Sequence, residues 1–555
     1  MTMAATTSGD TRDAIVVGAG IGGLTAAALL SRAGLRVCVV EQASQVGGCL
    51  ASFDRGGFRF DTSIHWLNQC APGGLARKVL DFIGPDSPPT RPAQRIRRMK
   101  GDSFDYLLTC CPDDLRDTLI RDYPAEEKGL RAFFRAAQSV GRSLARSADL
   151  FRTTHSMGLV ERSLFGLRSL PSLLPLIRYL PSSAEKGLGR FFAGRDMHRV
   201  FCSEENLLSC LVPIGWAYTG DYQHPPETGA SAFPQWLARV VERSGGEVLL
   251  GSRVSRILLD RGRVSGVAVR TAAGERDLAA GLVMAGCDVE SLYRGLLPPG
   301  ADRGLLGKLD RARIYKSAFT IHLGLDCSPG QLSLGEESVV LTRDGLSREE
   351  HNRTDPHTMP ITVLCPSLRN PSMAPPGKST LTIFVPAAYD HAGCWQTGRA
   401  TDGTRVRGEE YRAYKQQFAG ILIGRVEAGL VPGLRGYIEV REVATPITYQ
   451  RYTGNRLGSM MGFLPCAQNM RARVARYRTS VPGLFVCGQW AECGGGVPSA
   501  MRAAANACLL ALEDTVPGFC SALKDVADGR RSPVDAREGW ERSRPLHPGP
   551  QDVAL

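Results

Sequence analysis

The sequence predicts an α/β protein, and the prediction rests first on residues 14–48. Ala14–Val17 is a short apolar run rich in β-branched residues, which is typical of a buried parallel strand. A glycine-rich turn and a helix rich in alanine and leucine (24–31) follow it. A second strand at 36–40 then ends on Glu41. Strand, helix and strand in this order predict a βαβ unit, because parallel strands need a crossover connection.

The glycines of this unit predict a nucleotide site. Gly18, Gly20 and Gly23 stand at the three positions of a G-x-G-x-x-G pattern. The first allows a tight turn, the second lets the backbone approach a pyrophosphate, and the third lets helix and strand pack closely. Glu41 is placed to accept hydrogen bonds from a ribose. The run 14–30 is too short, and too broken by glycine, for a membrane span.

Two stretches downstream narrow the nucleotide. Gly47-Gly48 follows Glu41 closely, and residues 57–66 read G-F-R-F-D-T-S-I-H-W. They resemble the amine-oxidase-like FAD flavoproteins, and within them the branch of phytoene desaturases, carotenoid cis–trans isomerases and retinol saturases. The resemblance implies a Rossmann-type, glutathione-reductase-like domain with FAD as a bound prosthetic group, rather than diffusible NAD.

Three later stretches carry the same resemblance. Residues 370–378 read N-P-S-M-A-P-P-G-K and residues 445–455 read T-P-I-T-Y-Q-R-Y-T-G-N. Residues 481–500 hold a strand and a glycine-rich turn before an alanine-rich helix, where the family places the pyrimidine edge of the flavin. Gln489 stands where the family usually has aspartate, and an amide can still hydrogen-bond a ribityl hydroxyl or a phosphate. The chain also departs from the family's paired glycine at Thr228-Gly229.

These motifs predict a set of cofactor-binding residues. The predicted FAD contacts, which include the residues carried over from the family, are Gly18, Gly20, Ile21, Gly22, Gly23, Glu41, Gln42, Gly47, Gly48, Ser63, Ile64, Val254, Gly488, Gln489, Gly496, Val497 and Ala500.

The chain is expected to pass several times between two structural regions. An antiparallel sheet is expected to form the floor of the substrate cavity, next to a helical lid or membrane-facing region. The predicted parts are a disordered N-terminus (1–12), FAD-binding segments (13–100, 231–300 and 441–520), a helical substrate region (101–230), the antiparallel substrate sheet (301–440) and a disordered tail (528–555).

Residues 159–199 have a character of their own. Leucine-rich stretches alternate with arginine, and Pro171, Pro175 and Pro181 predict several short pieces rather than one long helix. Such a segment suits a membrane interface. A helical lid packed on the protein's own core is an equally weighted interpretation, and the family's membrane-associated enzymes tilt the choice slightly toward the surface.

Composition excludes some classes. The formal charge of +12 comes without a basic stripe interleaved with aromatic residues, so we expect no nucleic-acid partner. A basic surface facing anionic lipid is one alternative. The sixteen cysteines show neither metal-ligand spacing nor a disulfide framework, so no metal is predicted. No signal peptide is recognisable in residues 1–12. We expect a cytoplasmic protein, either free or peripheral at the inner membrane face, in an oligomeric state that the sequence leaves open.

The chemistry is assigned to the cofactor, because no nucleophile elbow and no metal-binding helix motif is present. His65 falls in the stretch that the resemblance places beside the flavin, and it is the first candidate for proton transfer. Tyr449 and Glu227 complete the predicted catalytic set. For His65 the alternative is a structural role in holding the loop, and for Glu227 it is simple solvation of the loop.

The first functional hypothesis is a desaturase that moves hydride from a long apolar polyene, carotenoid-like or lipid-like compound to flavin N5. A saturase or a cis–trans isomerase that works from reduced flavin is the second. An amine oxidase and a flavin-bound carrier without turnover are further alternatives.

Overall fold

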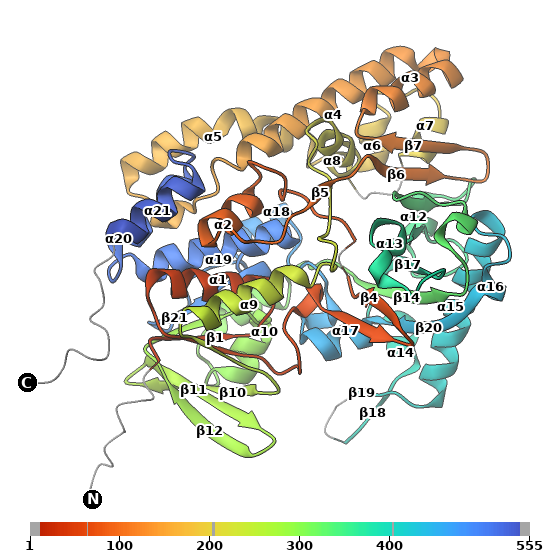
Figure 1. The fold of residues 1–555 in the computed structure, drawn as a ribbon. Helices are drawn as coiled ribbons and strands as arrows, with labels where there is room; N and C mark the ends of the chain where they lie inside the picture. Colours follow the sequence, from red (N-terminus) through yellow and green to blue (C-terminus); the bar gives the residue numbers. More distant parts are fainter. Residues whose placement is uncertain (1–11, 64, 202–205, 402–404, 544–555) are drawn as a thin grey trace, which may run out of the picture.

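The computed structural model describes residues 12–63, 65–201, 206–401 and 405–543. Its first region is built on a parallel sheet, as the βαβ pattern predicted (Figure 1). β1 lies at the centre and pairs with β2 on one side and β13 on the other. In sheet order the strands are β21 (Leu484–Val486), β13 (Leu282–Ala285), β1 (Ala14–Val17), β2 (Val37–Val40) and β9 (Glu247–Leu249).

Successive side chains of β1 point to opposite faces of the sheet, and each face has its own hydrophobic core. Ala14 and Val16 point into a core of helices, and Ile15 and Val17 point into the opposite core. The helical core holds α1 (Ile21–Ala33), α2 (Leu75–Ile83), α9 (Ala232–Arg243), α19 (Val497–Leu512) and α20 (Pro517–Ala527). The opposite core is covered by an antiparallel sheet of β10 (Arg253–Asp260), β11 (Arg263–Thr271) and β12 (Gly274–Ala279).

The second region is a seven-stranded sheet. Its order is β20 (Ile438–Ala444), β14 (Ser317–Leu325), β17 (Ser379–Ala387), β16 (Ile361–Leu364), β15 (Ser338–Leu341), β6 (Arg95–Lys100) and β7 (Asp105–Thr109). The pairs are antiparallel apart from β15 with β6, which is parallel. The predicted antiparallel sheet is therefore mixed at this point, and two of its strands come from residues 95–109, far before the predicted segment 301–440.

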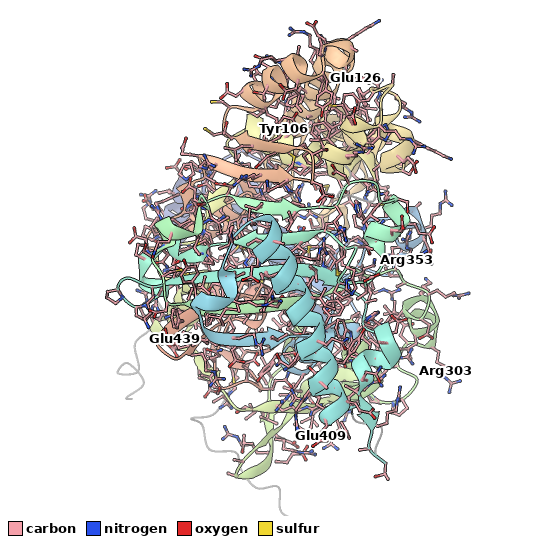
Figure 2. All side chains as sticks on the ribbon, turned by 90° about the vertical axis from the view of Figure 1, so that its right-hand side faces the viewer. Tyr106, Glu126, Arg303, Arg353, Glu409 and Glu439 are labelled. Carbon is pink, nitrogen blue, oxygen red and sulfur yellow. The ribbon has the colours of Figure 1, made fainter. Side chains whose placement is uncertain are left out.

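One face of this sheet is covered by α15 (Glu409–Gly429), which Figure 2 shows lying across the strands from its start at Glu409. Phe418, Leu422 and Val426 of α15 are buried in the same core as Phe319 and Ile321 of β14. The opposite face is left to the cavity described below. Short elements used later are β4 (Phe58–Asp61), β8 (Gln223–His224), α12 (Arg348–Asn352), α13 (Pro366–Arg369) and α17 (Pro446–Thr453).

Helices above the sheet form a fourth core, which lies at the top of Figure 1. They are α3 (Pro112–Asp122), α4 (Glu127–Ser147), α5 (Leu159–Tyr179), α6 (Ala184–Leu188), α7 (Asp196–Val200) and α8 (Leu207–Tyr218). In α4 and α8, Gly141 and Gly215 let the backbones touch, because a Cβ on Gly141 would lie 2.1 Å from the Gly215 carbonyl oxygen.

The prediction that prolines break residues 159–199 into short pieces is wrong for the first part. α5 is one helix that contains both Pro171 and Pro175. Each proline lacks the N–H that would bond the carbonyl four residues earlier. The helix tolerates the loss because it lies at the surface, where the freed carbonyls of Leu167 and Pro171 can bind water. Among the described helices, none is both long and apolar enough to cross a membrane.

The predicted disordered tail is also wrong for part of its length. Residues 533–543 form α21 (Pro533–Ser543), which packs against α2 and α20. Trp540 is nearly buried, lies against Phe519, and donates its indole N–H to the Arg32 carbonyl at 3.0 Å. The polar composition of this segment predicted disorder, but burial of the large Trp540 side chain between helices holds the segment in a fixed position. The predicted disorder of residues 1–11 and 544–555 lies outside the described residues.

Candidate active site

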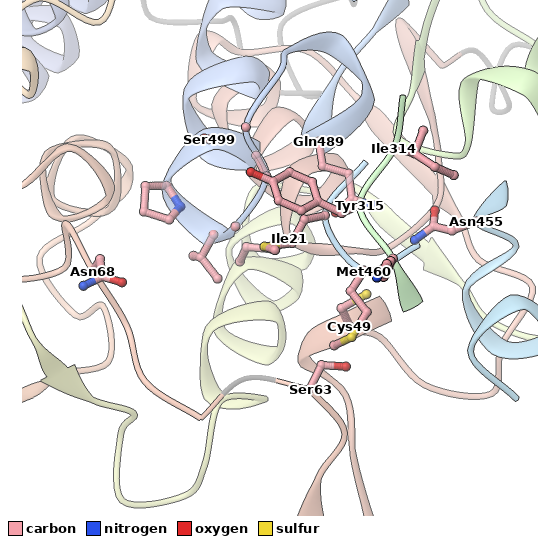
Figure 3. A pocket seen from close by; sticks show the side chains of 18 of the residues that line it. Ile21, Cys49, Ser63, Asn68, Ile314, Tyr315, Asn455, Met460, Gln489 and Ser499 are labelled. Atoms are coloured by element: carbon pink, nitrogen blue, oxygen red, sulfur yellow. The ribbon is translucent and has the colours of Figure 1, made fainter. Parts of the chain in front are cut away.

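A cavity of about 1700 Å³ lies between the parallel sheet and the seven-stranded sheet. Its walls come from the turns after β1 and β2, the start of α19, strands of the second sheet, the end of α4, the residues after α5, and one side of α8. Figure 3 shows part of the wall, where Ile21, Cys49, Met460, Gln489 and Tyr315 converge from distant segments. Ordinary ligand pockets hold roughly 300–1,000 Å³, so this one has room for two ligands at once.

Two helices direct their N-termini into one end of the cavity. α1 begins after Gly20 and α19 begins after Gly496, and neither has a side chain that caps its first N–H groups. Both glycines line the cavity. Because the first turn of a helix leaves N–H groups unpaired and carries partial positive charge, this end suits an anion such as a pyrophosphate.

The glycines form a cradle in which side chains have no room. A Cβ on Gly22 would lie 2.3 Å from the Cα of Gly488, and a Cβ on Gly23 would lie 2.1 Å from the Gly18 carbonyl oxygen. Gly20 differs, because a Cβ there would meet nothing within 4 Å. Backbone packing therefore requires glycine at positions 22 and 23. At position 20 the protein itself leaves room for a side chain, so glycine is required there only by a ligand bound in the cavity.

Glu41 is fixed at the end of β2. Its two carboxylate oxygens accept the N–H groups of Ala19 and Ala43, each at 2.7 Å. The side chain is nearly buried and lines the cavity. An anchored carboxylate beside a helix N-terminus is placed to accept the hydroxyls of a ribose, so the donor set fits a dinucleotide.

The structure brings together almost all the residues predicted to bind the cofactor. Gly23 packs helix α1 onto β1 instead of lining the cavity, in keeping with the close approach expected of it. Ile64 lies outside the described residues. The predicted residues that line the cavity are Gly18, Gly20, Ile21, Gly22, Glu41, Gln42, Gly47, Gly48, Ser63, Val254, Gly488, Gln489, Gly496, Val497 and Ala500.

Comparison with known proteins assigns this arrangement. The sequence model of one protein family, the flavin containing amine oxidoreductases, matches residues 21–511. The chain belongs to this family. FAD and a flavin-dependent oxidoreductase, both predicted from the sequence, are thereby confirmed.

Relatives agree with the predicted branch. All-trans-retinol 13,14-reductase of Danio rerio is 26% identical and covers 86% of this chain and 82% of its own. Phytoene desaturase (lycopene-forming) of Pseudescherichia vulneris is 24% identical over 90% of this chain and 99% of its own. An oxidoreductase from Methanosarcina mazei shares the fold, with a TM-score of 0.55 at 16% identity over 89% of this chain and 98% of its own.

His65 lines the cavity, as its predicted role requires. Its ring lies edge-on to Phe384, with 5.9 Å between ring centroids, and its Nε2 has no hydrogen-bond partner among the described residues. Burial, followed by the positive fields of His322 and Arg369, lowers its pKa to about 3. The imidazole is therefore neutral at physiological pH and free to bond a ligand.

Tyr449 is placed differently from the prediction. It is buried behind the cavity wall and is not among the residues that line it. Its hydroxyl lies 2.7 Å from the Thr320 hydroxyl and donates to the Thr62 carbonyl at 3.1 Å. Tyr449 thus ties α17 to the segment that carries His65, and it acts as a positioning residue.

The prediction of Glu227 as a catalytic residue is wrong. Its side chain is exposed, and it does not line the cavity. The reason is local: the turn at Gly229, with φ of +89°, brings the Ala230 N–H to the Asp61 carboxylate and leaves Glu227 on the outer side of the loop. A spacing argument cannot tell which side of a loop faces inward.

The structure adds cavity residues that the sequence motifs did not mark. Leu208, Val212 and Trp216 of α8 form an apolar wall, and Arg369 of α13 forms a charged one. The apolar periodicity of α8 predicts a buried helix face but not a cavity, and one arginine among many carries no local signal. Among the described residues, no group of three or more His, Cys, Asp or Glu side chains could hold a metal ion.

Proposed function

We propose that this flavoenzyme desaturates carbon–carbon bonds of a long, apolar polyene or lipid-like compound. The observation that carries the proposal is the cavity itself. From the nucleotide end it continues along Ile96, Val340 and Phe384 of the sheet and past Leu180 to α8, and these residues form an apolar part of its wall. The named substrates of the two curated relatives, retinol and phytoene, support this choice.

The protein's own residues bind, orient and shield the substrate. Bound FAD supplies hydride transfer at a carbon centre. Trp66, Trp216 and Trp490 all line the cavity, and their flat faces suit a conjugated chain. Loss of hydride from an allylic carbon leaves a strongly acidic C–H next to it. The unpaired Nε2 of His65, although a weak base, is sufficient to accept that proton.

An amine is a poorer fit. Among the described residues that line the cavity, the carboxylates are Glu41 and Asp288, and both lie at the nucleotide end, after β2 and β13. The other side of the cavity carries cationic residues, namely Arg95, Arg97, Lys316 and Arg369. A cationic ammonium group would meet like charge there. This argues against the amine-oxidase alternative.

We also propose that α5 meets a lipid surface. Eight of its apolar side chains are exposed, from Leu159 at 82% to Leu173 at 44% of their full area. A monomeric soluble protein rarely shows so continuous an apolar patch, and arginines on the same helix suit anionic headgroups. Leu180 and Pro181, directly after α5, line the cavity. A substrate dissolved in the bilayer would therefore enter beside this helix, and a cytoplasmic enzyme would sit peripherally.

An anaerobic experiment tests the function. The oxidised holoenzyme is mixed with polyenes and unsaturated lipids while the flavin absorbance is followed. We expect bleaching of the oxidised band together with one new double bond in the product. Without bleaching, the flavin is reduced with dithionite and the panel repeated. If product then forms and the flavin is reoxidised, the enzyme is a saturase and not a desaturase. If product forms while the flavin stays reduced, the enzyme is an isomerase. If no product forms with oxidised or with reduced flavin, the hypothesis of a flavin-bound carrier without turnover is the one that is left.

A further inference from the structure

A polar cluster interrupts the apolar part of the cavity wall. It consists of His65 after β4, His224 of β8 and Arg369 of α13, all three of which line the cavity, with Glu336 beside them. The three elements lie far apart in the sequence and meet only through the tertiary fold. None of these residues belongs to the predicted cofactor-binding set, so the nucleotide motifs do not account for this cluster.

Arg369 is held in place but not neutralised by its hydrogen bonds. Its Nη1 donates to the His65 carbonyl at 2.5 Å, and its Nε donates to the Glu336 carbonyl at 2.6 Å. Both acceptors are uncharged. Burial lowers the pKa of Arg369 to about 10, so the guanidinium keeps its charge at neutral pH. Two fixed bonds leave the rest of the planar fork oriented for a ligand.

The two histidines are buried without enough partners. His65 is 8% exposed and His224 is 4% exposed. Among the described residues, His65 Nε2 and His224 Nδ1 have no hydrogen-bond partner. Buried polar atoms are nearly always paired in native proteins, so orphaned atoms in two residues that line the cavity indicate a ligand as the missing partner.

The net charge of the cluster indicates the sign of the charge on that ligand. Glu337 is engaged in a two-bond ion pair with Arg95, and Glu336 lies 3.3 Å from His224 Nε2. Arg91 donates to the Arg369 carbonyl at 2.7 Å, which adds another positive group. Among these contacts the three arginines Arg369, Arg95 and Arg91 outnumber the two glutamates Glu336 and Glu337. The imbalance is positive.

We propose that this cluster binds a carboxylate at the end of the substrate, so that the enzyme acts on an apolar polyene acid rather than on a hydrocarbon. The inference rests on the proposed function and narrows its substrate class. A carboxylate offers two acceptor oxygens, one for the Arg369 fork and one for the imidazole N–H of His224. The apolar chain would then lie along Phe384, Val340 and Ile96, which line the same cavity.

Binding to the oxidised holoenzyme tests this without requiring turnover. The probes share one carbon skeleton: all-trans-retinoic acid, all-trans-retinol, and the hydrocarbon that ends in methyl. Affinity is measured by perturbation of the flavin spectrum and by equilibrium dialysis. We expect the acid to bind about tenfold or more tightly than the alcohol, since a charge-assisted bond is roughly twice as strong as a neutral one.

Variants assign the preference to the cluster. Arg369→Gln is expected to reduce the acid-to-alcohol ratio to nearly one, and Arg369→Lys to restore part of it. His224→Phe removes the second donor and lowers acid affinity while leaving Arg369 and its two backbone bonds in place, which serves if Arg369→Gln fails to fold. Arg353→Gln is the matched control. This arginine also lines the cavity, but at an exposed position paired with Glu349, and its loss should leave the ratio unchanged.

The outcomes separate this inference from the proposed function. Equal or weaker binding of the acid in the unmodified protein overturns the carboxylate site, even if a hydrocarbon bleaches the flavin. An acid preference that survives Arg369→Gln and His224→Phe also overturns it. A preference that depends on both residues supports the site, even if none of the probes reacts and the proposed desaturation fails.

Discussion

Gly22 and Gly488 touch each other across the cofactor site, so that a Cβ on Gly22 would lie 2.3 Å from the Cα of Gly488. Gly22 belongs to the first turn of α1, and Gly488 follows β21 near the C-terminal end of the chain. Gly488 has a φ of +77°, which favours glycine, and a Cβ on it would lie 3.5 Å from the Cα of Gly22. The contact closes the first and last cofactor-binding segments into one cradle.

The contact predicts that replacement by alanine destabilises the protein at Gly22 but not at Gly20. Gly22→Ala should lower the melting temperature and the flavin content, because backbone atoms within 2.3 Å cannot yield. Gly20→Ala should leave the melting temperature of the flavin-free protein unchanged, because its Cβ would meet nothing within 4 Å and its φ of −73° suits any residue. Thermal unfolding and flavin absorbance of both proteins provide the check. Equal stability of the two variants would contradict the cradle.

Gly20→Glu should abolish flavin binding while the protein still folds. The new carboxylate would project into the cavity where two helix N-termini favour the anionic pyrophosphate, and like charge would exclude it. The flavin-to-protein absorbance ratio of the purified protein measures the effect. Gly281→Glu, at an exposed glycine with the same free space, should purify with normal flavin content. A yellow Gly20→Glu protein would refute the assignment of this turn.

His65→Ala should retain FAD and slow substrate-dependent flavin reduction roughly 10²-fold, the usual range for a lost proton-transfer group. His65 lies on the cavity wall but outside the cradle of glycines, so flavin content is not expected to change. Anaerobic stopped-flow absorbance gives the rate. Since the pKa of His65 is about 3, the unmodified enzyme should show no inflection from this residue near pH 6.5. An unchanged reduction rate in His65→Ala would remove the residue from the mechanism.

Buried histidines should make the protein sensitive to acid. Burial lowers the pKa of His322 from 6.5 to about 4, and it lowers those of His65 and His224 as well. Between about pH 6.5 and pH 4 the unfolded chain binds protons that the folded chain does not, so the free energy of unfolding falls as the pH falls.

His322→Leu tests this most directly, because His322 lies away from the cavity between Phe53 and Phe60. The slope of unfolding free energy against pH in that window should decrease by up to about 1.4 kcal/mol per pH unit, the value for one proton. Denaturant titrations at several pH values give the slope. Replacing the exposed His357 by Gln is the control and should leave the slope as it is. The same slope in His322→Leu would show that His322 does not titrate as described.

Replacing exposed leucines of α5 should weaken lipid binding without loss of flavin. Leu164, Leu167 and Leu174 are 58%, 69% and 55% exposed, and the triple serine variant removes their apolar area without adding charge. We expect its affinity for phosphatidylcholine–phosphatidylglycerol vesicles to fall by about tenfold or more in co-sedimentation. Leu250→Ser, at an exposed leucine in another part of the molecule, should bind vesicles normally. Binding that is unaffected by the triple change would remove α5 as the lipid-facing element.

The prolines of α5 and the tail at α21 show where sequence patterns were misleading. Pro171 and Pro175 predicted a break, but a surface helix can leave carbonyls to water. The polar composition of residues 528–555 predicted a solvated tail, yet Trp540 closes a gap in the helical core. Both errors have one cause: a local rule was overruled by what surrounds the segment in three dimensions.

The sequence by itself determined the cofactor end of this protein. Gly18, Gly20, Gly23 and Glu41 follow one another within a single βαβ unit, and their roles depend on backbone geometry that short-range order dictates. Only the tertiary structure decided the substrate end. Arg369, His224 and His65 become neighbours because β4, β8 and α13 meet at one wall, and Glu227 is excluded because its loop turns outward. The physical reason is that the glycine-rich turn and the acid of a nucleotide site follow one another in one continuous stretch, whereas a large cavity is enclosed by side chains that only long-range packing brings together.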